Sequence, residues 1–348
     1  MSADGGVTWS EWAEPPSPSE VDQYYSMVVD PVSASAATQR LVVDNYTKLW
    51  FSANGGADWT MVAQRPSGSG PIPWGGDGSA ASVRLAGAAW DGDTIYIGTN
   101  VGVFRSTNGG VTWNAFSPLG LPNGAQIVEF CGAKPSGGGS LTLFATAIDS
   151  LGQFPYDSSK VEGWVNQYAV DEVDRYLGLY ALNTGVSPLA WVQRNGPGNL
   201  PFARVDVPPL NSSRPWAATS RNVDTVDGGG VYKGSVSGTV WSWTRSLEAE
   251  PPGGGDNVAV TTGYQGDGGV LNWSWSYPTL GLDVSDSNAD RVIVSGDLPY
   301  LTENGGTSWM QMFVNPATEN AAGSAIPRPK AYHHSGLGVT TGHWLHWV

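Results

Sequence analysis

The sequence predicts an all-β fold of repeated, four-stranded antiparallel units, and three observations lead to this prediction. One turn motif occurs four times, at 2–9, 52–59, 106–113 and 302–309. The first three copies begin at 2, 52 and 106, which gives a repeat of about 50 residues. The 348 residues include 47 Gly and 24 Pro, a content that suits many short strands and turns better than helices.

The repeated motif is expected to form a hairpin turn. In the third copy, Ser106 precedes Asn108, Gly109 and Gly110, and Trp113 follows them. The Asn can accept a hydrogen bond from its own backbone two residues on, and the two glycines are free to take positive φ. The Ser hydroxyl can close the turn, and the Trp is expected to fill the space between neighbouring units. The pattern is therefore explained without a ligand.

The four copies resemble the Asp-box, S/T-x-D/N-x-G-x-T/S-W, of sialidases, sortilin and the xyloglucan hydrolases of glycoside hydrolase family 74. These families are β-propellers, so the resemblance implies a propeller whose Asp-boxes join the third and fourth strands of a blade. It also implies that the boxes lie away from the binding face. The same box serves hydrolases, receptors and assembly factors, so it implies architecture and not function.

About six blade units are visible, which predicts a propeller of six or seven blades in a single domain, 1–348. The expected units are a partial blade at 1–20, blades at 21–65, 82–118, 125–195, 201–247 and 279–314, insertions at 149–176 and 248–278, and the first strand of a further or composite blade at 335–348.

The units at 21–65 and 82–118 show the blade pattern most plainly, because four short apolar runs alternate with turn residues in each. The expected strands are 25–30, 40–44, 48–51 and 58–62 in the first of these units, and 83–89, 94–98, 102–105 and 111–116 in the second.

The next two units have decayed boxes, and the last complete unit returns to the regular pattern. A box remnant stands at 182–185 before Trp191, and a box without its acid at 235–241. The expected strands are 126–131, 141–146 and 177–181, then 202–207, 216–220 and 230–233, then 280–284, 290–294, 299–301 and 308–314.

Both ends of the sequence are expected to be fragments of blades. A turn between third and fourth strands stands at the start, and a first strand stands at the end. The two could close one composite blade. We prefer an excerpt from a longer tandem, because such a composite blade would lack its second strand.

The charge balance excludes two classes of partner. There are 17 Lys and Arg against 31 Asp and Glu, a formal net charge of −14, whereas nucleic acids and anionic membranes require basic surfaces. No apolar run approaches the ~18 residues of a membrane span, so no membrane insertion is expected. The chain carries no signal peptide, but the resemblance implies an extracellular or cell-surface protein whose leader is removed or lies outside this sequence.

No cofactor and no metal are expected. The single cysteine, Cys131, cannot form an internal disulfide, and its strand-like surroundings predict a buried, inert thiol. The four histidines stand at 333, 334, 343 and 346. His343 and His346 are three apart and would face opposite sides of a strand, which disfavours metal binding.

Ligands of a propeller meet the face formed by the loops between blades and between second and third strands. Long loops concentrate function, and three stand out here, at 149–176, 247–278 and 314–334. The first contains Trp164, Tyr168 and Asp171, which join aromatic rings to a carboxylate. Such rings suit the C–H faces of sugars, and carboxylates accept hydrogen bonds from vicinal hydroxyls. The alternative is a solvated loop that covers a blade.

The second long loop holds Trp273, Trp275 and Tyr277 at alternate positions. On a strand these side chains would share one face and form a stacking strip for sugar rings. The alternative is packing between blades, because large aromatic side chains are normally core residues.

Three inner strands carry candidate catalytic acids, Glu129, Asp206 and Asp283, each between apolar neighbours. Strand alternation turns each carboxylate away from these neighbours, and we expect it to face the central channel. Two acids are the minimum for glycoside hydrolysis. The alternative is a water-filled channel lined by acids that perform no chemistry.

The catalytic motifs of the resembling families are missing. The sequence contains neither the Arg-Ile-Pro motif expected of a sialidase nor the acid-bearing opening of the first blade in family 74, and no catalytic residue is carried over. The leading hypothesis is a carbohydrate-binding or carbohydrate-active propeller that takes a neutral polysaccharide or glycan. Enzyme status stays open, and the enzyme would be a glycoside hydrolase. The alternative is a non-catalytic, receptor-like propeller with a protein or glycan partner.

Overall fold

The structure is a computed structural model of the 348-residue chain. It describes residue 15 and residues 26–33, 35–44, 48–64, 83–149, 175–219, 229–248, 259–262, 281–295, 299–314 and 326–327. The candidate ligand-binding residues Trp164, Tyr168, Asp171, Trp273, Trp275 and Tyr277 lie outside these ranges, as do the first Asp-box and the four histidines.

The described residues form five four-stranded antiparallel sheets, each in the order of the sequence, which confirms the all-β propeller fold. Blade I contains β1 (Ser26–Val29), β2 (Leu41–Asp44), β3 (Lys48–Ser52) and β4 (Thr60–Gln64). Blade II contains β5 (Leu85–Asp91), β6 (Thr94–Thr99), β7 (Gly102–Ser106) and β8 (Asn114–Phe116). Blade III contains β9 (Gln126–Ala133), β10 (Thr142–Ile148), β11 (Tyr176–Asn183) and β12 (Val192–Gln193).

Blades IV and V complete the described sheets. Blade IV contains β13 (Arg204–Asp206), β14 (Trp216–Ala218), β15 (Gly230–Ser237) and β16 (Val240–Glu248). Blade V contains β18 (Gly281–Val284), β19 (Val292–Ser295), β20 (Pro299–Thr302) and β21 (Trp309–Gln311). The units with decayed boxes therefore form four-stranded sheets like the others.

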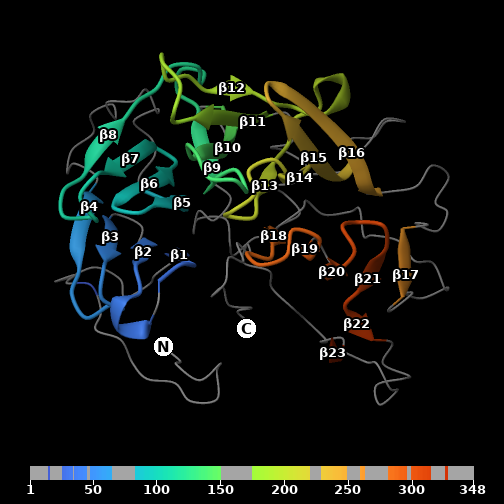
Figure 1. The fold of residues 1–348 in the computed structure, drawn as a ribbon, viewed down its shortest axis with the longest axis horizontal. Coiled ribbons are helices and arrows are strands. Elements are labelled where there is room, and N and C mark those ends of the chain that lie inside the picture. Colours follow the sequence, from blue (N-terminus) through green and yellow to red (C-terminus); the bar gives the residue numbers. More distant parts are fainter. Residues whose placement is uncertain are drawn as a thin grey trace.

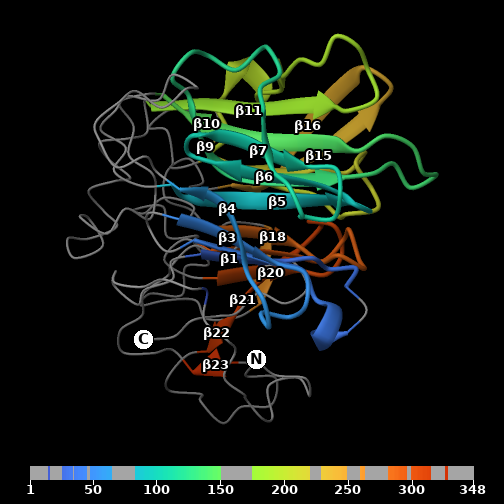
Figure 2. The same ribbon diagram turned by 90° about the vertical axis from the view of Figure 1, so that its left-hand side faces the viewer.

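The blades are arranged in an arc with their first strands at the centre. Figure 1 shows β1, β5, β9, β13 and β18 around the middle of the molecule, and the fourth strands at its rim. Consecutive first strands are in contact along this arc. In Figure 2, turned by 90°, the strands of all blades run across the view, so the turns at their ends form two opposite faces.

A few described elements lie outside the blades. β17 (Val260–Thr262) pairs in parallel with the outer strand β21, and β22 (Phe313–Val314) pairs in parallel with β23 (Ile326–Pro327). Two short 3₁₀ helices span Ala36–Thr38 and Pro197–Asn199. Among the described residues, no helix has the length and apolar character needed to span a membrane.

The core lies between the blades, because each pair of neighbouring sheets buries a shared apolar cluster. The cluster between blades II and III joins Val103 and Phe116 to Ile127, Phe130 and Trp191. Similar clusters join blades I and II, III and IV, and IV and V. Blades II, III and IV are thus buried on both faces against neighbours, which explains why strands such as β13 and β14 are buried along their whole length.

The three described Asp-boxes have the predicted turn geometry. Both glycines take positive φ in every box, for example +69° at Gly109 and +92° at Gly110. The Ser106 hydroxyl accepts hydrogen bonds from the backbone N–H groups of Asn108 (3.3 Å) and Gly110 (2.9 Å). One detail differs from the prediction, because Asn108 Oδ1 accepts from Thr112 N, four residues on instead of two (3.0 Å).

Two of the three described Asp-box tryptophans, Trp113 and Trp309, pack against the preceding blade, as expected. Trp113 meets Phe51 of blade I edge-on, with ring centroids 5.4 Å apart. Trp309 meets Trp216 of blade IV at 6.2 Å and donates its indole N–H to Ser246 of that blade (3.3 Å).

The decayed boxes take two different forms. Asn183 of blade III keeps a capping role, since its Oδ1 accepts from Gly185 N at 2.8 Å, two residues on. In blade IV the chain stays in strands up to Ser237 and from Val240, and these two residues pair directly. Gly238, with φ of +61°, lies in the two-residue loop between them. The expected Asp-box turn at 235–241 is therefore replaced by a tight hairpin.

Candidate functional site

One face of the propeller is closed by hydrogen bonds between its turns. In each described Asp-box, the N–H of the first glycine donates to a carbonyl in the turn between the first and second strands of the same blade. The pairs are Gly55 to Gln39 (2.8 Å), Gly109 to Asp93 (2.9 Å) and Gly305 to Asp290 (2.8 Å). We call this the Asp-box face. These bonds tie the two turns of each blade together on this face.

The opposite face carries the connections between second and third strands and the linkers between blades. We call it the linker face. The expected long insertion of blade III connects β10 to β11 on this face. Its ends are tied together, because Asp149 N donates to Arg175 O (2.9 Å) and the Arg175 guanidinium pairs with the Asp149 carboxylate (3.1 Å).

A pocket of about 480 Å³ opens between blades II and III, and we call it the inter-blade pocket. It is formed by the β6–β7 turn, the 117–125 linker with the strand residues Phe116 and Ile127 that flank it, and Trp191, which precedes β12. Its lining residues are Asn100, Val101, Gly102, Val103, Phe116, Ser117, Pro118, Leu121, Pro122, Asn123, Ala125, Ile127 and Trp191. The volume falls within the ~300–1,000 Å³ range of small-molecule sites.

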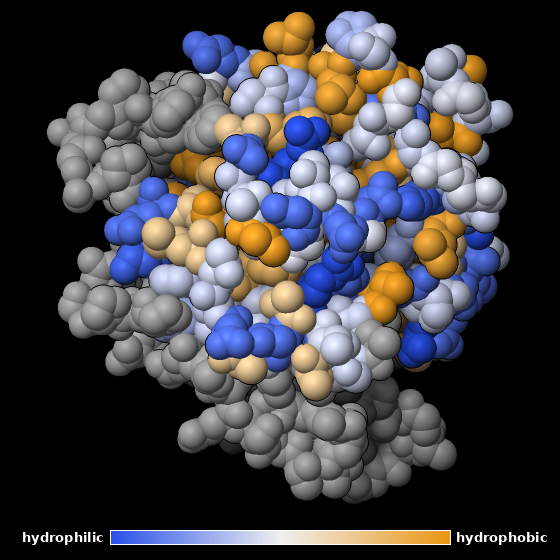
Figure 3. Space-filling model, turned by 60° about the vertical axis from the view of Figure 1, so that its left-hand side comes forward, coloured by the Kyte–Doolittle hydropathy of each residue, from blue (hydrophilic) through white to orange (hydrophobic). Residues whose placement is uncertain are grey.

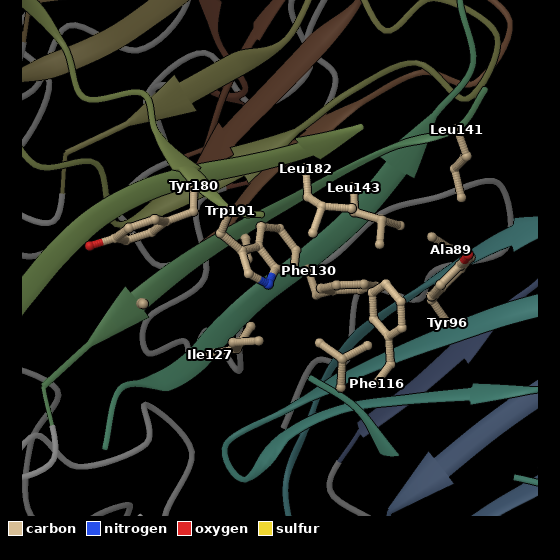
Figure 4. Packing of buried hydrophobic residues seen from close by; sticks show 13 residues of the cluster. Ala89, Tyr96, Phe116, Ile127, Phe130, Leu141, Leu143, Tyr180, Leu182 and Trp191 are labelled. Carbon is tan, nitrogen blue, oxygen red and sulfur yellow. The ribbon is translucent and has the colours of Figure 1, made fainter. Parts of the chain in front are cut away.

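The inter-blade pocket has a buried apolar floor and an exposed polar rim. Phe116, Ile127 and Trp191 belong to the core cluster between the two blades and are almost fully buried, as Figure 4 shows. Ser117 and Asn123 at the rim are exposed. None of the lining residues carries a charge, although the whole chain has a net charge of −14. An ionic ligand would therefore find no partner in this lining.

Two backbone contacts hold the pocket in shape. Trp191 N donates to Leu119 O at 2.7 Å, which ties the linker to blade III. Gly120 has φ of +104°, and a Cβ there would lie 2.2 Å from Trp191 O, so only glycine allows this approach. On the other side, Arg84 N donates to Asn100 Oδ1 (2.8 Å) and fixes the β6–β7 turn.

Two of the three candidate catalytic acids, Glu129 and Asp206, contact the first strand of the next blade. Asp206 Oδ2 accepts from Val284 N on the next blade at 2.7 Å, and Glu129 Oε1 lies 3.4 Å from Arg204 Nε on the next blade. The reason is that blades pack face to face, so strand alternation points side chains at the preceding or the following blade. The next residue, Phe130, points toward the preceding blade instead. Its ring lies against Gly98 of blade II, where an added Cβ would be 2.3 Å from the ring.

The structure brings these acids into one cluster. The Asp206 and Asp283 carboxyls are close enough to affect each other's ionisation, and both residues are buried, with 7% and 5% of their surface exposed. Burial raises the pKa of Asp206 to about 7, against the lowering effect of the Val284 N–H. Burial also raises the pKa of Glu129 to about 7, against the attraction of Arg204. Carboxyl groups with such pKa values hold a proton near neutral pH.

Cys131 lies next to this cluster and is only partly buried by surface area, less than its strand-like surroundings predicted. Its surroundings raise the pKa of its thiol well above the usual value, through burial first and then through the charges of Asp206 and Glu129. A thiol of this kind stays protonated and is a poor nucleophile, as the sequence predicted. Among the described residues, no group of three His, Cys, Asp or Glu is arranged to hold a metal ion.

The inter-blade pocket was not predicted from the sequence. It draws on three segments separated by up to 90 residues, and none of them contains a binding motif. The only signals were the Pro- and Gly-containing linker at 117–124 and the Trp that follows the decayed box of blade III. The Trp was assigned to the remnant of an Asp-box, and the linker was assigned no function.

Apolar side chains on the described surface are scattered. Val32, Met61, Leu119, Leu210 and Val240 are exposed and belong to different turns and strands. Figure 3 shows small apolar groups among polar ones on the face in view. A large apolar docking surface is not found in this part of the chain.

Comparisons with known proteins agree with the propeller fold. No protein-family model matches the chain, and no curated protein matches its sequence. An ancestral GH74 enzyme is similar in structure, with a TM-score of 0.46 and 16% identity over 85% of this chain and 41% of its own. The GH74 enzyme of Niastella koreensis gives 0.39 and 15% over 83% of this chain and 58% of its own.

YCF48 bound to D1 peptide is also similar, with a TM-score of 0.35 and 11% identity over 83% of this chain and 80% of its own. The chain spans 41% and 58% of the two GH74 structures. All three TM-scores lie below 0.5, and likeness at this level assigns no function to this chain.

Proposed function

We propose that this propeller binds a neutral glycan through its linker face, with the inter-blade pocket as a binding site. The observation that carries the proposal is the uncharged lining of that pocket. Its polar groups are amides and a hydroxyl, which match sugar hydroxyls, and its apolar floor matches the C–H faces of a sugar ring. A polysaccharide ligand would also place the protein outside the cell or at its surface.

The positions of the two long connections in the chain also favour the linker face as the glycan-binding surface. The segment between β10 and β11 contains Trp164, Tyr168 and Asp171, and the segment that follows β16 contains Trp273, Trp275 and Tyr277. Both segments leave from ends of strands that belong to the linker face. We propose that their aromatic side chains extend the binding surface beyond the pocket.

Affinity electrophoresis tests this proposal with gels that contain xyloglucan, linear arabinan, galactomannan or hydroxyethylcellulose. We expect at least one neutral polysaccharide to retard the protein and anionic polygalacturonate to leave it unaffected. Ser117→Trp fills the mouth of the pocket and should weaken binding at least ten-fold. Ser287→Trp places the same side chain on an exposed turn of the Asp-box face and should bind like the wild type.

Two results would overturn the proposal. One is a protein that none of the neutral polysaccharides retards. The other is a Ser117→Trp variant that folds and binds as tightly as the wild type. Retardation by an immobilised protein or peptide in place of any polysaccharide would favour the alternative, a receptor-like propeller.

A glycoside hydrolase is the second candidate, and one observation favours it. The pKa values of about 7 for Glu129 and Asp206 lie where a general acid works at neutral pH. Against it, Asp206 and Asp283 are buried, and neither they nor Glu129 line the pocket. Release of reducing ends from the same polysaccharides, abolished by Glu129→Gln, would establish hydrolysis.

A further inference from the structure

The indole N–H of Trp191 has no hydrogen-bond acceptor among the described residues, although the side chain is only 4% exposed. Four other tryptophans in the described sheets and turns do donate: Trp113 to Gly110 O, Trp216 to Ala289 O, Trp243 to Arg194 O and Trp309 to Ser246 Oγ. The Trp50 indole N–H is also unpaired among the described residues, but it is fully buried, whereas the Trp191 N–H is not fully buried and belongs to a side chain that lines the inter-blade pocket.

This donor lies at the inter-blade pocket. Trp191 lines the pocket together with Ile127, and Figure 4 shows the indole nitrogen on the edge of the ring that faces Ile127. The ring is fixed in place by its backbone bond to Leu119 O (2.7 Å) and by edge-on packing against Phe130, with centroids 6.4 Å apart. The donor is therefore held in one orientation before any ligand arrives.

We propose that Trp191 is the anchoring hydrogen-bond donor of the inter-blade pocket, and that it binds a hydroxyl or ring oxygen of one neutral sugar unit. This inference rests on the proposed glycan-binding function and assigns a residue and an atom to it. An indole N–H can only donate, so it requires an acceptor atom in the ligand.

The uncharged lining and the unpaired N–H together disfavour anionic ligands and purely apolar ligands. A carboxylate or phosphate would satisfy the N–H but would be buried without a counter-charge, because the lining has none. A purely apolar ligand would leave the N–H unpaired. A sugar unit supplies acceptor oxygens for the floor, C–H groups for Phe116 and Ile127, and hydroxyls for the exposed Asn123 amide at the rim.

The first test observes the donor directly in the wild-type protein by ¹H–¹⁵N correlation spectra. The 17 tryptophans give 17 indole signals, and the Trp191 signal is the one that disappears in Trp191→Phe. Xyloglucan heptasaccharide, cellohexaose and arabinohexaose are titrated in turn. We expect the ligand that binds to shift the Trp191 signal downfield and to leave the Trp243 signal, which donates to Arg194 O, unchanged.

The second test compares two matched variants. Trp191→Phe and Trp243→Phe both remove an indole from a packed position, but only the first removes a donor from the pocket. We expect Trp191→Phe to bind the oligosaccharide about ten-fold more weakly, the factor that corresponds to one net hydrogen bond of ordinary strength. Trp243→Phe should lose thermal stability and keep the wild-type affinity.

The possible failures are distinguishable. If the wild type binds an oligosaccharide while the Trp191 signal stays in place and Trp191→Phe keeps full affinity, the assignment of Trp191 is wrong and the proposed function stands. If the wild type binds no neutral sugar in either assay, the proposed function itself is wrong.

Discussion

Asp206 is a residue at which the sign of a pH effect can be predicted. Its pKa is raised from 3.8 to about 7 in the folded state, and that of Glu129 from 4.5 to about 7. Both groups bind a proton more tightly when the chain is folded. Their stabilising contribution is therefore complete below the unfolded-state values and is lost as the pH rises to about 7.

The first prediction follows from this sign. Asp206→Asn has the shape of the protonated carboxyl, and its side-chain oxygen can still accept from Val284 N. We expect the variant to match the wild type at about pH 4 and to exceed its free energy of unfolding at pH 8 by ~2 kcal/mol. Urea unfolding at the two pH values measures the difference. Equal stability at pH 8 would contradict the raised pKa.

Asp290 supplies a control of opposite sign. The hydrogen bond from Arg214 is the main cause that holds the pKa of this carboxyl below its usual value. Its stabilising contribution is present above the unfolded-state pKa and is lost as the pH falls. Asp290→Asn should therefore lower stability at pH 8, where Asp206→Asn raises it.

At the scale of the elements, the two glycines of an Asp-box have different roles. Both need positive φ, but a Cβ on Gly109 has only Asp93 Oδ1 near it, at 3.6 Å. A Cβ on Gly110 would lie 2.1 Å from the Phe51 ring of blade I. In the box at 106–113 the first glycine therefore serves its own turn, and the second allows the box to approach the neighbouring blade. In the box at 302–309 the first glycine also approaches the neighbouring blade, since a Cβ on Gly305 would lie 2.7 Å from Lys233 Nζ of blade IV.

This difference gives a prediction with an internal control. Gly109→Ala should cost about 1 kcal/mol, the strain of an L-residue in the left-handed region. Gly110→Ala should cost about 3 kcal/mol or more, because the displacement of Phe51 adds to the same strain. Chemical unfolding of both variants tests this. Equal costs would mean that Phe51 moves aside freely.

The sequence predicted the elements well where local chemistry decides them. Two glycines and a hydroxyl residue define each Asp-box locally, and the observed φ values and hydrogen bonds agree with the prediction. Prediction failed where the outcome depends on distant residues. The loop at Gly238 became a tight hairpin because β15 and β16 pair right up to it. The pairing of Glu129 with Arg204 was not predicted either, because Arg204 lies far along the chain, on the next blade.

The same reason explains why the site was harder to predict than the fold. The inter-blade pocket combines Asn100, Ser117 and Trp191, which only the packing of two blades brings together. Single aromatic and amide residues carry no spacing signal. The predicted stacking residues in the long connections lie outside the described residues, so they stay predictions.

At the scale of the whole molecule, Lys and Arg side chains link neighbouring blades on the Asp-box face. Arg40 pairs with Asp30 of its own blade and donates to Gly92 O of blade II at 2.5 Å. Lys134 of blade III reaches Asp91 of blade II at 2.5 Å, and Arg214 of blade IV pairs with Asp290 of blade V. Each link starts from the turn between the first and second strands.

These links should differ in strength according to their burial. The Asp30 side chain is 1% exposed, whereas those of Lys134 and Asp91 are 34% and 33% exposed. Arg40→Met leaves the Asp30 carboxylate with the N–H of Val32 as its one hydrogen-bond partner among the described residues, and should cost about 3 kcal/mol.

Lys134→Met is the matched variant for this comparison and should cost less than about 1 kcal/mol. Urea unfolding in low and high salt measures both, and only the exposed Lys134 link should weaken with salt. A small cost for Arg40→Met would show that blade closure does not depend on this link.

The clamp between Asp149 and Arg175 has a consequence for how this fold can change. It holds the two ends of a connection at a fixed separation, directly above the paired strands β10 and β11. The entropy of closing a loop between fixed ends rises slowly, by ~0.6 kcal/mol for each doubling of its length. The Asp149–Arg175 pair therefore defines an insertion site at which segments of very different length and sequence can replace one another. A new binding specificity could be grafted there while the blades beneath keep their pairing.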